Sequence, residues 1–255
     1  MVDELRSPFL VLSLSLFLMW SSVWIGVFLR KRHLELDQDV SRDLEFILAS
    51  TLTLLSLLIG FSLSMAISRY DLRKNYEEAE ANAIGTEYLR AGMLPATDAA
   101  RVRTLLRDYL QLRISFYQSR DKQVLQEINS HTAQLQAELW SAVQAPAAAQ
   151  PNPVLALVLS GMNDVLNSQG YTQAAWWNRT PIGVWGLMAT VGICSCLMVG
   201  YIAHRAREGF VRLLILPLVL GIAFFLIADI DSPRRGVIRV VPQNLISLSQ
   251  SLPGR

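Results

Sequence analysis

The chain has 255 residues, of which 52% are hydrophobic and only 17% are charged, and its mean hydropathy is +0.31. This composition is too apolar for an ordinary soluble domain of that length. The net charge is +2, but the basic residues are scattered or flank apolar segments, so no nucleic-acid partner is predicted.

Four apolar blocks are long enough to cross a membrane. Each approaches or exceeds the roughly 20 apolar residues needed for a hydrocarbon core about 30 Å thick. They lie at about 8–29, 46–68, 182–203 and 210–230. The sequence therefore predicts an all-α membrane protein with four transmembrane helices in contact with the lipid bilayer.

The first block could be a cleaved signal peptide or a retained span. The segment before it carries Asp3 and Glu4 against a single basic residue, Arg6. The apolar run is longer than the hydrophobic region of a signal peptide and stops at Arg30-Lys31-Arg32 without a small-x-small cleavage site. We interpret the block as a retained span.

Span two is predicted to continue out of the bilayer as one long helix. No proline occurs between residues 46 and 91, and Gly92 and Pro95 supply a stop. At 1.5 Å per residue, such a helix is about 65 Å long. About half of its length must therefore project from the hydrocarbon.

The region between spans two and three is predicted to be a helical extramembrane domain. Apolar residues at helical spacing indicate amphipathic helices at 97–120 and 121–145. A loop is expected at 145–153, and Asn152-Pro153 forms a cap and first-turn pair that opens a short helix to about residue 168.

The chain is accordingly divided into four parts. They are an N-terminal segment with the first hairpin (1–68), the helical domain (69–180), the second hairpin (181–231) and a C-terminal tail (232–255). Trp176 and Trp177 precede span three, where they are typical of an interfacial aromatic belt. Pro217 is expected to kink span four.

A stripe of small side chains runs along span two. Its members, one every four residues, are Ser56, Gly60, Ser64 and Ser68. This spacing places them on one helix face. Such a face is typical of a seam where helices pack closely in lipid, although it could also line a polar pore.

A second row lies beside the small stripe, about 60° around the helix. It consists of Thr53, Leu57 and Phe61. This mainly apolar row could be part of the helix-bundle core. It could also form a hydrophobic constriction, which channels use to gate ions by controlling wetting.

Charged residues mark the ends of spans two and four. They are Arg69, Arg73, Asp229 and Asp231. The arginines could be basic side chains that reach the membrane interface, and an ion pair between the two helices is an alternative. Two carboxylates without further clustered acids are a weak basis for a cation site, so no metal is predicted.

No pattern in the sequence indicates catalysis. It contains no nucleotide-binding loop, zinc-ligand spacing, or serine–histidine or cysteine–histidine arrangement of any specificity. We therefore predict neither a cofactor nor enzymatic activity. Nearly equal numbers of basic residues flank the spans on the two sides, so charge does not decide the orientation.

Two sequence features resemble known membrane proteins. Gly60-Phe61, a gap of seven residues and then Arg69-Tyr70 resemble the second transmembrane helix of bestrophin channels. RYDLRKNYEEAEANAIGTEYLR and DIDSPRRGVIRV are similar to the two ends of the domain of the bacterial bestrophin-like family. The second resemblance covers most of the chain.

The resemblance implies a function and an orientation. Bestrophins are pentameric anion channels with cytoplasmic termini, a cytoplasmic helical domain and a narrow apolar neck. The resemblance implies that this chain forms a homo-oligomer, a pentamer, in the bacterial inner membrane. This assembly would passively conduct small anions such as chloride. Residues 69–180 and both termini would then be cytoplasmic. The alternative is a non-conducting scaffold or sensor whose helical domain binds a partner.

The resemblance also assigns roles along span two. Aligned on Gly60-Phe61, the neck positions fall on Thr53, Leu57 and Phe61, and the small stripe would seat each copy against its neighbour. Thr53 departs from the usual apolar residue. Bestrophins that bind calcium carry a longer acidic run after span four than DIDSPRR, so no calcium site is implied.

Overall fold

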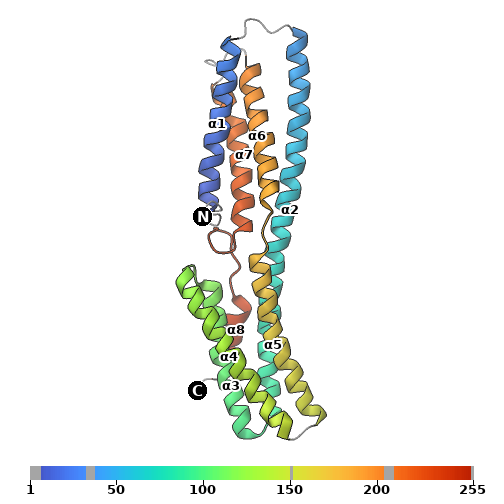
Figure 1. Cartoon of the computed structure of the whole chain (residues 1–255), viewed down its shortest axis with the longest axis vertical. Helices are drawn as coiled ribbons and strands as arrows, with labels where there is room; N and C mark the ends of the chain where they lie inside the picture. The colour runs from blue at the N-terminus through green and yellow to red at the C-terminus, as the bar shows by residue number, and fades with distance from the viewer. Residues whose placement is uncertain (1–6, 33–37, 150–151, 204–209, 254–255) are drawn as a thin grey trace. The chain divides into compact units, whose positions relative to one another are not determined.

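The computed structural model describes residues 7–32, 38–149, 152–203 and 210–253 (Figure 1). Within these ranges the chain is helical apart from short connections and contains no strand. Four of the described helices are long and apolar enough to cross a membrane. The predicted fold class is therefore confirmed.

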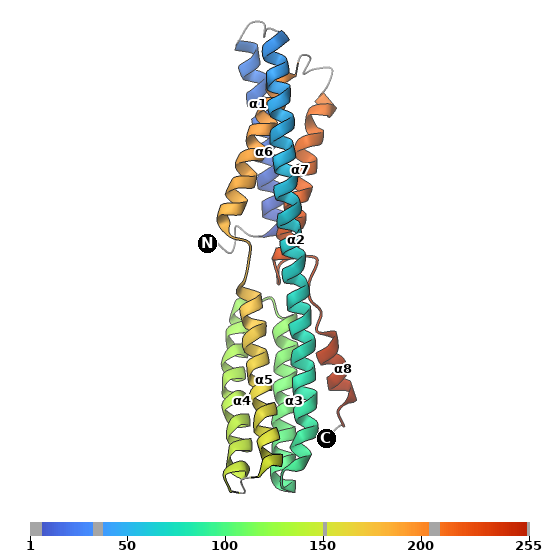
Figure 2. The ribbon, with the colours of Figure 1, turned by 90° about the vertical axis from the view of Figure 1, so that its right-hand side faces the viewer.

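The helices follow one another along the chain with short connections (Figures 1 and 2). They are α1 (Pro8–Arg32), α2 (Gln38–Arg90), the 3₁₀ turn η1 (Ala91–Met93), α3 (Ala96–Gln118), α4 (Lys122–Ala149), α5 (Pro153–Trp177), α6 (Ile182–Ile202), α7 (Phe210–Asp231) and α8 (Gln243–Ser251).

The chain forms two compact units. The first, here called the transmembrane unit, comprises Met1–Arg69 and Arg179–Arg239. The second, the helical unit, comprises Tyr70–Asn178 and Val240–Arg255. The C-terminal residues that follow span four are thus shared between the units, and their last part forms α8.

Helix α2 is unbroken over 53 residues, which confirms that span two continues into the helical domain. It gives way to η1 after Arg90. Leu94 then adopts an extended conformation with φ −79° and ψ 161°, because the residue before a proline is disfavoured in a helix. The predicted stop at Gly92 and Pro95 is confirmed.

In the transmembrane unit, α1 and α6 pack backbone against backbone. A Cβ atom at Gly26 would overlap the carbonyl oxygen of Leu197, and one at Gly200 would overlap the carbonyl oxygen of Val23. Only glycine allows the two backbones to come this close. Such close contacts supply the packing energy between helices in lipid. Arg30 of α1 also donates to the carbonyl oxygen of Tyr201, at 2.9 Å.

All four spans meet at Gly192 of α6. The atoms nearest to a Cβ at this position belong to Met19, Leu220 and Leu55, which come from α1, α7 and α2. Met19 and Leu55 are each 1% exposed. This convergence point positions α2 against the other three spans.

The helical unit is built around an apolar core between α2, α3, α4, α5 and α8 (Figure 2). Its fully buried members include Ile84, Leu106, Leu139, Met162 and Leu245. They come from these five helices in turn. Burial of such amphipathic faces is the main force that orders helices in water.

Helix α8 was not predicted. Its first turn is held by the buried carboxylate of Glu77 on α2, which accepts from the backbone N–H of Leu245 at 3.0 Å and from the side-chain amide of Asn244 at 2.7 Å. A carboxylate at a helix N-terminus accepts hydrogen bonds from the free N–H groups there, and its negative charge interacts favourably with the helix dipole.

Two predicted boundaries in the helical unit were wrong. Helix α4 continues through Pro146 to Ala149, so the loop begins later than residue 145. Helix α5 continues to Trp177 instead of ending near 168, because its second half also buries a face against the unit. The Asn152 cap is confirmed: its side-chain oxygen accepts from the N–H of Leu155 at 2.9 Å.

The expected tryptophan belt is also corrected. Trp176 is 4% exposed and packs against Phe116 and Tyr117 in the helical unit, with ring centroids 5.2 and 5.4 Å apart. Trp177 is exposed. Adjacent residues on a helix point about 100° apart, so only one of the two rings reaches the core.

Candidate pore helix and the charged cluster at its end

Helix α2 is the least buried of the candidate membrane spans. Only 11% of its most apolar segment is buried within the protein, against 28% for α1 and 44% for α7. The covered face of α2 carries Leu55, Ser62 and Ala66, which are 1%, 1% and 0% exposed. The rest of its circumference is available to lipid or to another protein surface.

The row of candidate pore residues lies on the uncovered part of α2. Leu57 is 54% and Phe61 is 60% exposed, and Thr53 is also exposed. The hydroxyl of Thr53 donates to the carbonyl oxygen of Ala49 at 2.8 Å. This internal bond satisfies the hydroxyl proton within the helix, so the row presents a largely apolar surface.

The small stripe is likewise uncovered. All four of its members, Ser56, Gly60, Ser64 and Ser68, are exposed. Among the described residues, no atom outside the local helix lies within 4 Å of a Cβ placed at Gly60. Ser56 and Ser68 donate back to carbonyl oxygens of their own helix at 2.8 and 3.0 Å. The stripe therefore makes a face of small side chains on which the hydroxyls of Ser56 and Ser68 are bonded within the helix.

A polar cluster joins the end of the apolar part of α2 to the end of α7. Arg69 donates to the carboxylate of Asp231 at 3.2 Å and to the hydroxyl of Thr180 at 2.9 Å. The backbone N–H of Thr180 donates to the same carboxylate at 3.0 Å. This is an ion pair between the two helices, the alternative raised for these charges by the sequence.

Asp229 holds the chain that follows α7. Asp229 is 1% exposed, and its carboxylate accepts from the backbone N–H groups of Val237 and Ile238 at 2.7 and 2.8 Å. A Cβ at Gly236 would overlap the carbonyl oxygen of Asp229, so the fold-back requires glycine. Both aspartates thus bind groups of the protein itself. Within the described ranges, no three His, Cys, Asp or Glu side chains form a potential metal cluster.

Arg73 belongs to the helical unit and is 1% exposed. Its Nε donates to the carbonyl oxygen of Ala175 at 3.2 Å, and its Nη2 donates to that of Asn178 at 3.3 Å. A guanidinium at a helix C-terminus satisfies its last carbonyl groups and interacts favourably with its dipole. Arg73 therefore ties α2 to the end of α5.

The sequence matches a known protein family over most of its length. The family described as "Bestrophin-like domain" matches residues 14–245. The chain belongs to the bestrophin-like family. No curated protein matched the chain.

Solved structures agree with this membership at the level of the fold. A mutant bacterial bestrophin homolog from Klebsiella pneumoniae has a TM-score of 0.62 and 12% identity, covering 95% of this chain and 99% of that one. A zinc-phased structure of the homolog has a TM-score of 0.61 and 12% identity, covering 96% and 99%. A mutant structure described as a membrane protein has a TM-score of 0.64 and 12% identity, covering 93% and 98%.

The helical unit of this bestrophin-like protein contains a buried ion pair that the sequence analysis did not identify. The guanidinium of Arg113 on α3 donates to Glu80 on α2, and both side chains have 0% exposure. Tyr117 and Thr172 also donate to this carboxylate, each at 3.2 Å. Burial disfavours the charged form of Arg113, but Glu80, together with Tyr109 and Tyr117, more than offsets this and raises the pKa of the guanidinium.

A second buried carboxylate on α2 is less well satisfied. Glu87 has 0% exposure, and neither of its oxygens has a hydrogen-bond partner among the described residues. Burial raises the pKa of Glu87 to about 8; Arg90 lowers it and Asp164 raises it further. Two sequence features could have indicated these buried charges. One is an arginine within the apolar stripe of α3, and the other is the helical spacing that places glutamates of α2 on the same face as the buried Ile84.

Proposed function

We propose that this bestrophin-like protein is a passive anion channel of the bacterial inner membrane, a pentamer whose pore is lined by α2. The observation that carries the proposal is the uncovered row of Thr53, Leu57 and Phe61 on the least buried span. Large apolar side chains on a helix that its own chain leaves open are suited to a shared central axis.

The angle between the row and the small stripe supports this assembly. In a ring of five helices, the directions to the axis and to the neighbouring helix differ by about 54°. The two faces of α2 differ by roughly 60°. When the row faces the axis, the stripe of Ser56, Gly60, Ser64 and Ser68 faces the next copy, and its small side chains permit close contact.

The row would act as a narrow neck. Rings of Leu57 and Phe61 from successive copies make an apolar constriction, which controls conduction through its width and its wetting. The electropositive edges of phenylalanine rings are compatible with a passing anion. Thr53 would make its level of the neck less apolar. Residues 69–180 and both termini would lie in the cytoplasm, and Arg69 and Asp231 would lie near that membrane surface.

Conduction is tested with the purified full-length protein in planar bilayers. We expect a current whose reversal potential follows the chloride gradient. No current under varied pH and calcium would contradict the proposal. A monomer in detergent, or a dimer without a central axis, would contradict the pore directly.

The residue assignment needs a separate test. Replacing Leu57 and Phe61 with alanine should change conductance or anion selectivity, because the neck widens at two levels. The matched control is Leu187→Ala, which removes a leucine of similar exposure (50%) from α6 instead of α2. If the double variant changes only stability, as in the control, the row is not a pore lining and a non-conducting scaffold or sensor is the better description.

A further inference from the structure

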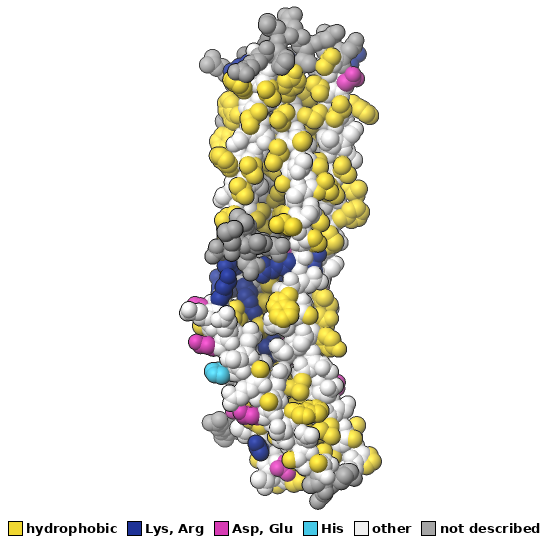
Figure 3. Space-filling view, in the orientation of Figure 1, with side chains coloured by type: hydrophobic (Ala, Val, Ile, Leu, Met, Phe, Trp, Pro, Cys, Tyr) yellow, Lys and Arg dark blue, Asp and Glu magenta, His cyan; other side chains and the backbone are white. Residues whose placement is uncertain are grey.

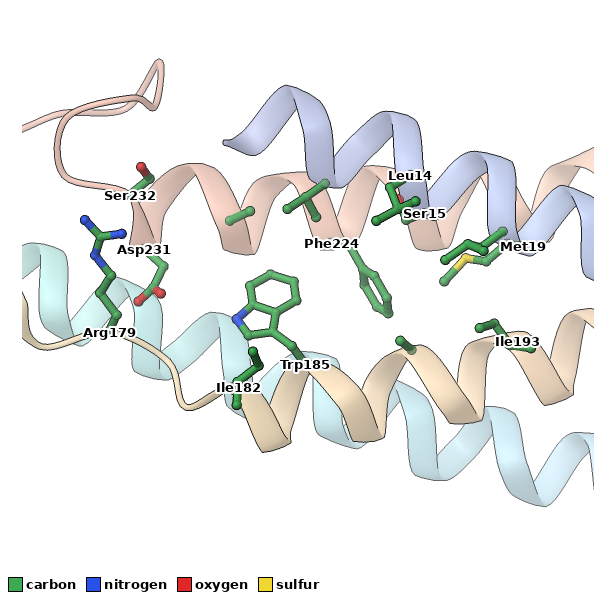
Figure 4. A pocket seen from close by; sticks show the side chains of 14 residues that line it. Leu14, Ser15, Met19, Arg179, Ile182, Trp185, Ile193, Phe224, Asp231 and Ser232 are labelled. Carbon is green, nitrogen blue, oxygen red and sulfur yellow. The ribbon is translucent and has the colours of Figure 1, made fainter. Parts of the chain in front are cut away.

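A cavity of about 240 Å³ lies within the transmembrane unit, between α1, α6 and α7 (Figure 4). Its walls are mostly apolar and include Leu14, Met19, Trp185, Ile193 and Phe224. None of its lining residues belongs to α2. The cavity is therefore separate from the row and the stripe assigned to the pore.

One end of the cavity is polar. Arg179, Asp231 and Ser232 line it there, whereas Met19 and Ile193 lie at the opposite end, with Trp185 and Phe224 between (Figure 4). The polar end coincides with the end of α7 and the start of α6, where the spans leave the hydrocarbon. The cavity thus has one charged end and an otherwise apolar wall, which matches a lipid headgroup with one acyl chain.

The segment after α7 concentrates positive charge at this end. The bonds from Val237 and Ile238 to Asp229 fold the chain back onto the last turn of α7. Arg234 and Arg235 lie in the intervening turn, next to the cavity-lining Ser232. Figure 3 shows basic side chains gathered on the visible face of the protein, beside a surface rich in hydrophobic side chains.

Among the residues that the structure describes, basic side chains outnumber acidic ones at this end of the transmembrane unit. The acidic residues are Asp229 and Asp231, and the basic residues are Arg69, Arg179, Arg234 and Arg235. These arginines outnumber the two described carboxylates by two to one. Val237 is 68% exposed beside the arginines, a combination of apolar and basic groups that suits an anionic lipid surface.

We propose that this cavity is a binding site for an anionic phospholipid. One acyl chain lies between α1, α6 and α7 against Trp185 and Phe224, and the phosphate lies at Arg179 and the turn that carries Arg235. The volume is below the roughly 300–1,000 Å³ of sites that enclose a whole small ligand, so the second chain remains in the bilayer.

The chemistry favours a lipid over other occupants. An apolar cavity offers water too few hydrogen-bond partners, while hydrocarbon chains are the solvent around the spans. A second copy of the protein is the other candidate, but the uncovered faces of α2 are better suited to that contact. The site does not depend on whether the protein conducts ions.

The test uses native mass spectrometry of the full-length protein after exchange into a 1:1 mixture of phosphatidylglycerol and phosphatidylcholine in mild detergent. We expect about one tightly retained phosphatidylglycerol per chain. Ala189→Phe, which fills the cavity from α6, should abolish retention. The matched control is Leu187→Phe on the exposed part of the same helix, which should retain the lipid.

The headgroup assignment is tested by Arg179→Gln, with Arg101→Gln on the exposed surface of α3 as control. Because one arginine near an anionic lipid contributes about a fivefold preference, we expect Arg179→Gln to reduce the preference for phosphatidylglycerol by about that factor and Arg101→Gln to leave it unchanged. Equal retention of the two lipids by the unaltered protein would overturn the anionic assignment.

A second readout covers the case in which Ala189→Phe does not fold. Brominated phosphatidylglycerol should quench a tryptophan component that saturates near one lipid per chain and is missing in Trp185→Phe. Quenching that is identical in Trp185→Phe, or lipid retention that survives Ala189→Phe, would overturn the site. If Ala189→Phe changes the oligomeric state but leaves lipid retention unchanged, the cavity would be assigned to a second copy of the chain.

Discussion

The two units of this protein use different means to hold helices together. The transmembrane unit brings backbones into contact at Gly26 and Gly200. The helical unit encloses charged side chains such as Glu80 and Arg113. Lipid provides no hydrophobic force between spans, so close packing must supply the attraction. In water, burial of apolar faces provides that force and offsets the desolvation of a paired charge. Loss of a charge partner should therefore disrupt the helical unit. Added side-chain volume at a glycine contact should disrupt the transmembrane unit.

The largest effect is expected from Glu80→Gln. The substitution leaves the buried charge of Arg113 without its counter-ion, which costs about 3–5 kcal/mol. Unfolding of the full-length protein in detergent, followed by circular dichroism, measures the loss. Glu78→Gln, two positions away and exposed, is the control. Equal stability of the two variants would show that the pair contributes nothing.

Gly200→Val tests the contact between α1 and α6. The new side chain must displace the backbone of Val23, and overpacking typically costs about 1–3 kcal/mol. Unfolding in mixed micelles measures the change. Gly186→Val on the same helix is the control, because no described atom lies within 4 Å of a Cβ there. If both valines are tolerated equally, α1 and α6 are not held by the glycine contact.

Glu87 should make the stability of the helical unit depend on pH. Burial raises the pKa of Glu87 from 4.5 to about 8, so between these values the unfolded chain releases a proton that the folded chain keeps. Its contribution is therefore full below pH 4.5 and declines as the pH rises toward 8. Across this window the free energy of unfolding should fall by at most about 1.4 kcal/mol for each pH step of one.

Glu87→Gln should flatten that decline, because glutamine does not titrate. Thermal unfolding of both proteins across the pH range is the measurement, and the exposed Glu78→Gln variant is again the control. The same decline in Glu87→Gln as in the unaltered protein would assign the pH dependence to another group.

The smallest effect is expected from Asn152→Ala at the start of α5. The alanine loses the bond to the N–H of Leu155, which typically costs about 1 kcal/mol. Asn163→Ala, on the exposed surface of the same helix, should change the free energy of unfolding by less than about 0.5 kcal/mol. A cap variant as stable as this control would show that α5 does not need the cap.

Local features were predictable from the sequence. The Asn152 cap and the stop after α2 depend on residues within one helical turn, and the sequence shows them directly. The burial of Trp176 and the continuation of α5 to Trp177 were not predictable in this way. They depend on Phe116 and Tyr117, which are far from Trp176 along the chain.

The candidate site was predictable only in part. The small stripe and the adjacent row follow from the helical repeat, and whether they form a seam and a pore remains a prediction. The role of Arg73 could not be deduced, because a basic residue at the end of an apolar run suits an interface as well as the carbonyl groups that it contacts. Its partners lie 102 and 105 residues away in the chain.

The sequence by itself determined four membrane spans and an unbroken α2, because span length, hydropathy and the lack of a helix breaker act within one segment. Only the tertiary structure decided which carboxylates are buried and paired, that α1 and α6 meet at glycines, and that α1, α6 and α7 enclose a cavity. Those features arise where residues distant in the chain meet, and burial and pairing depend on the surroundings that this meeting creates.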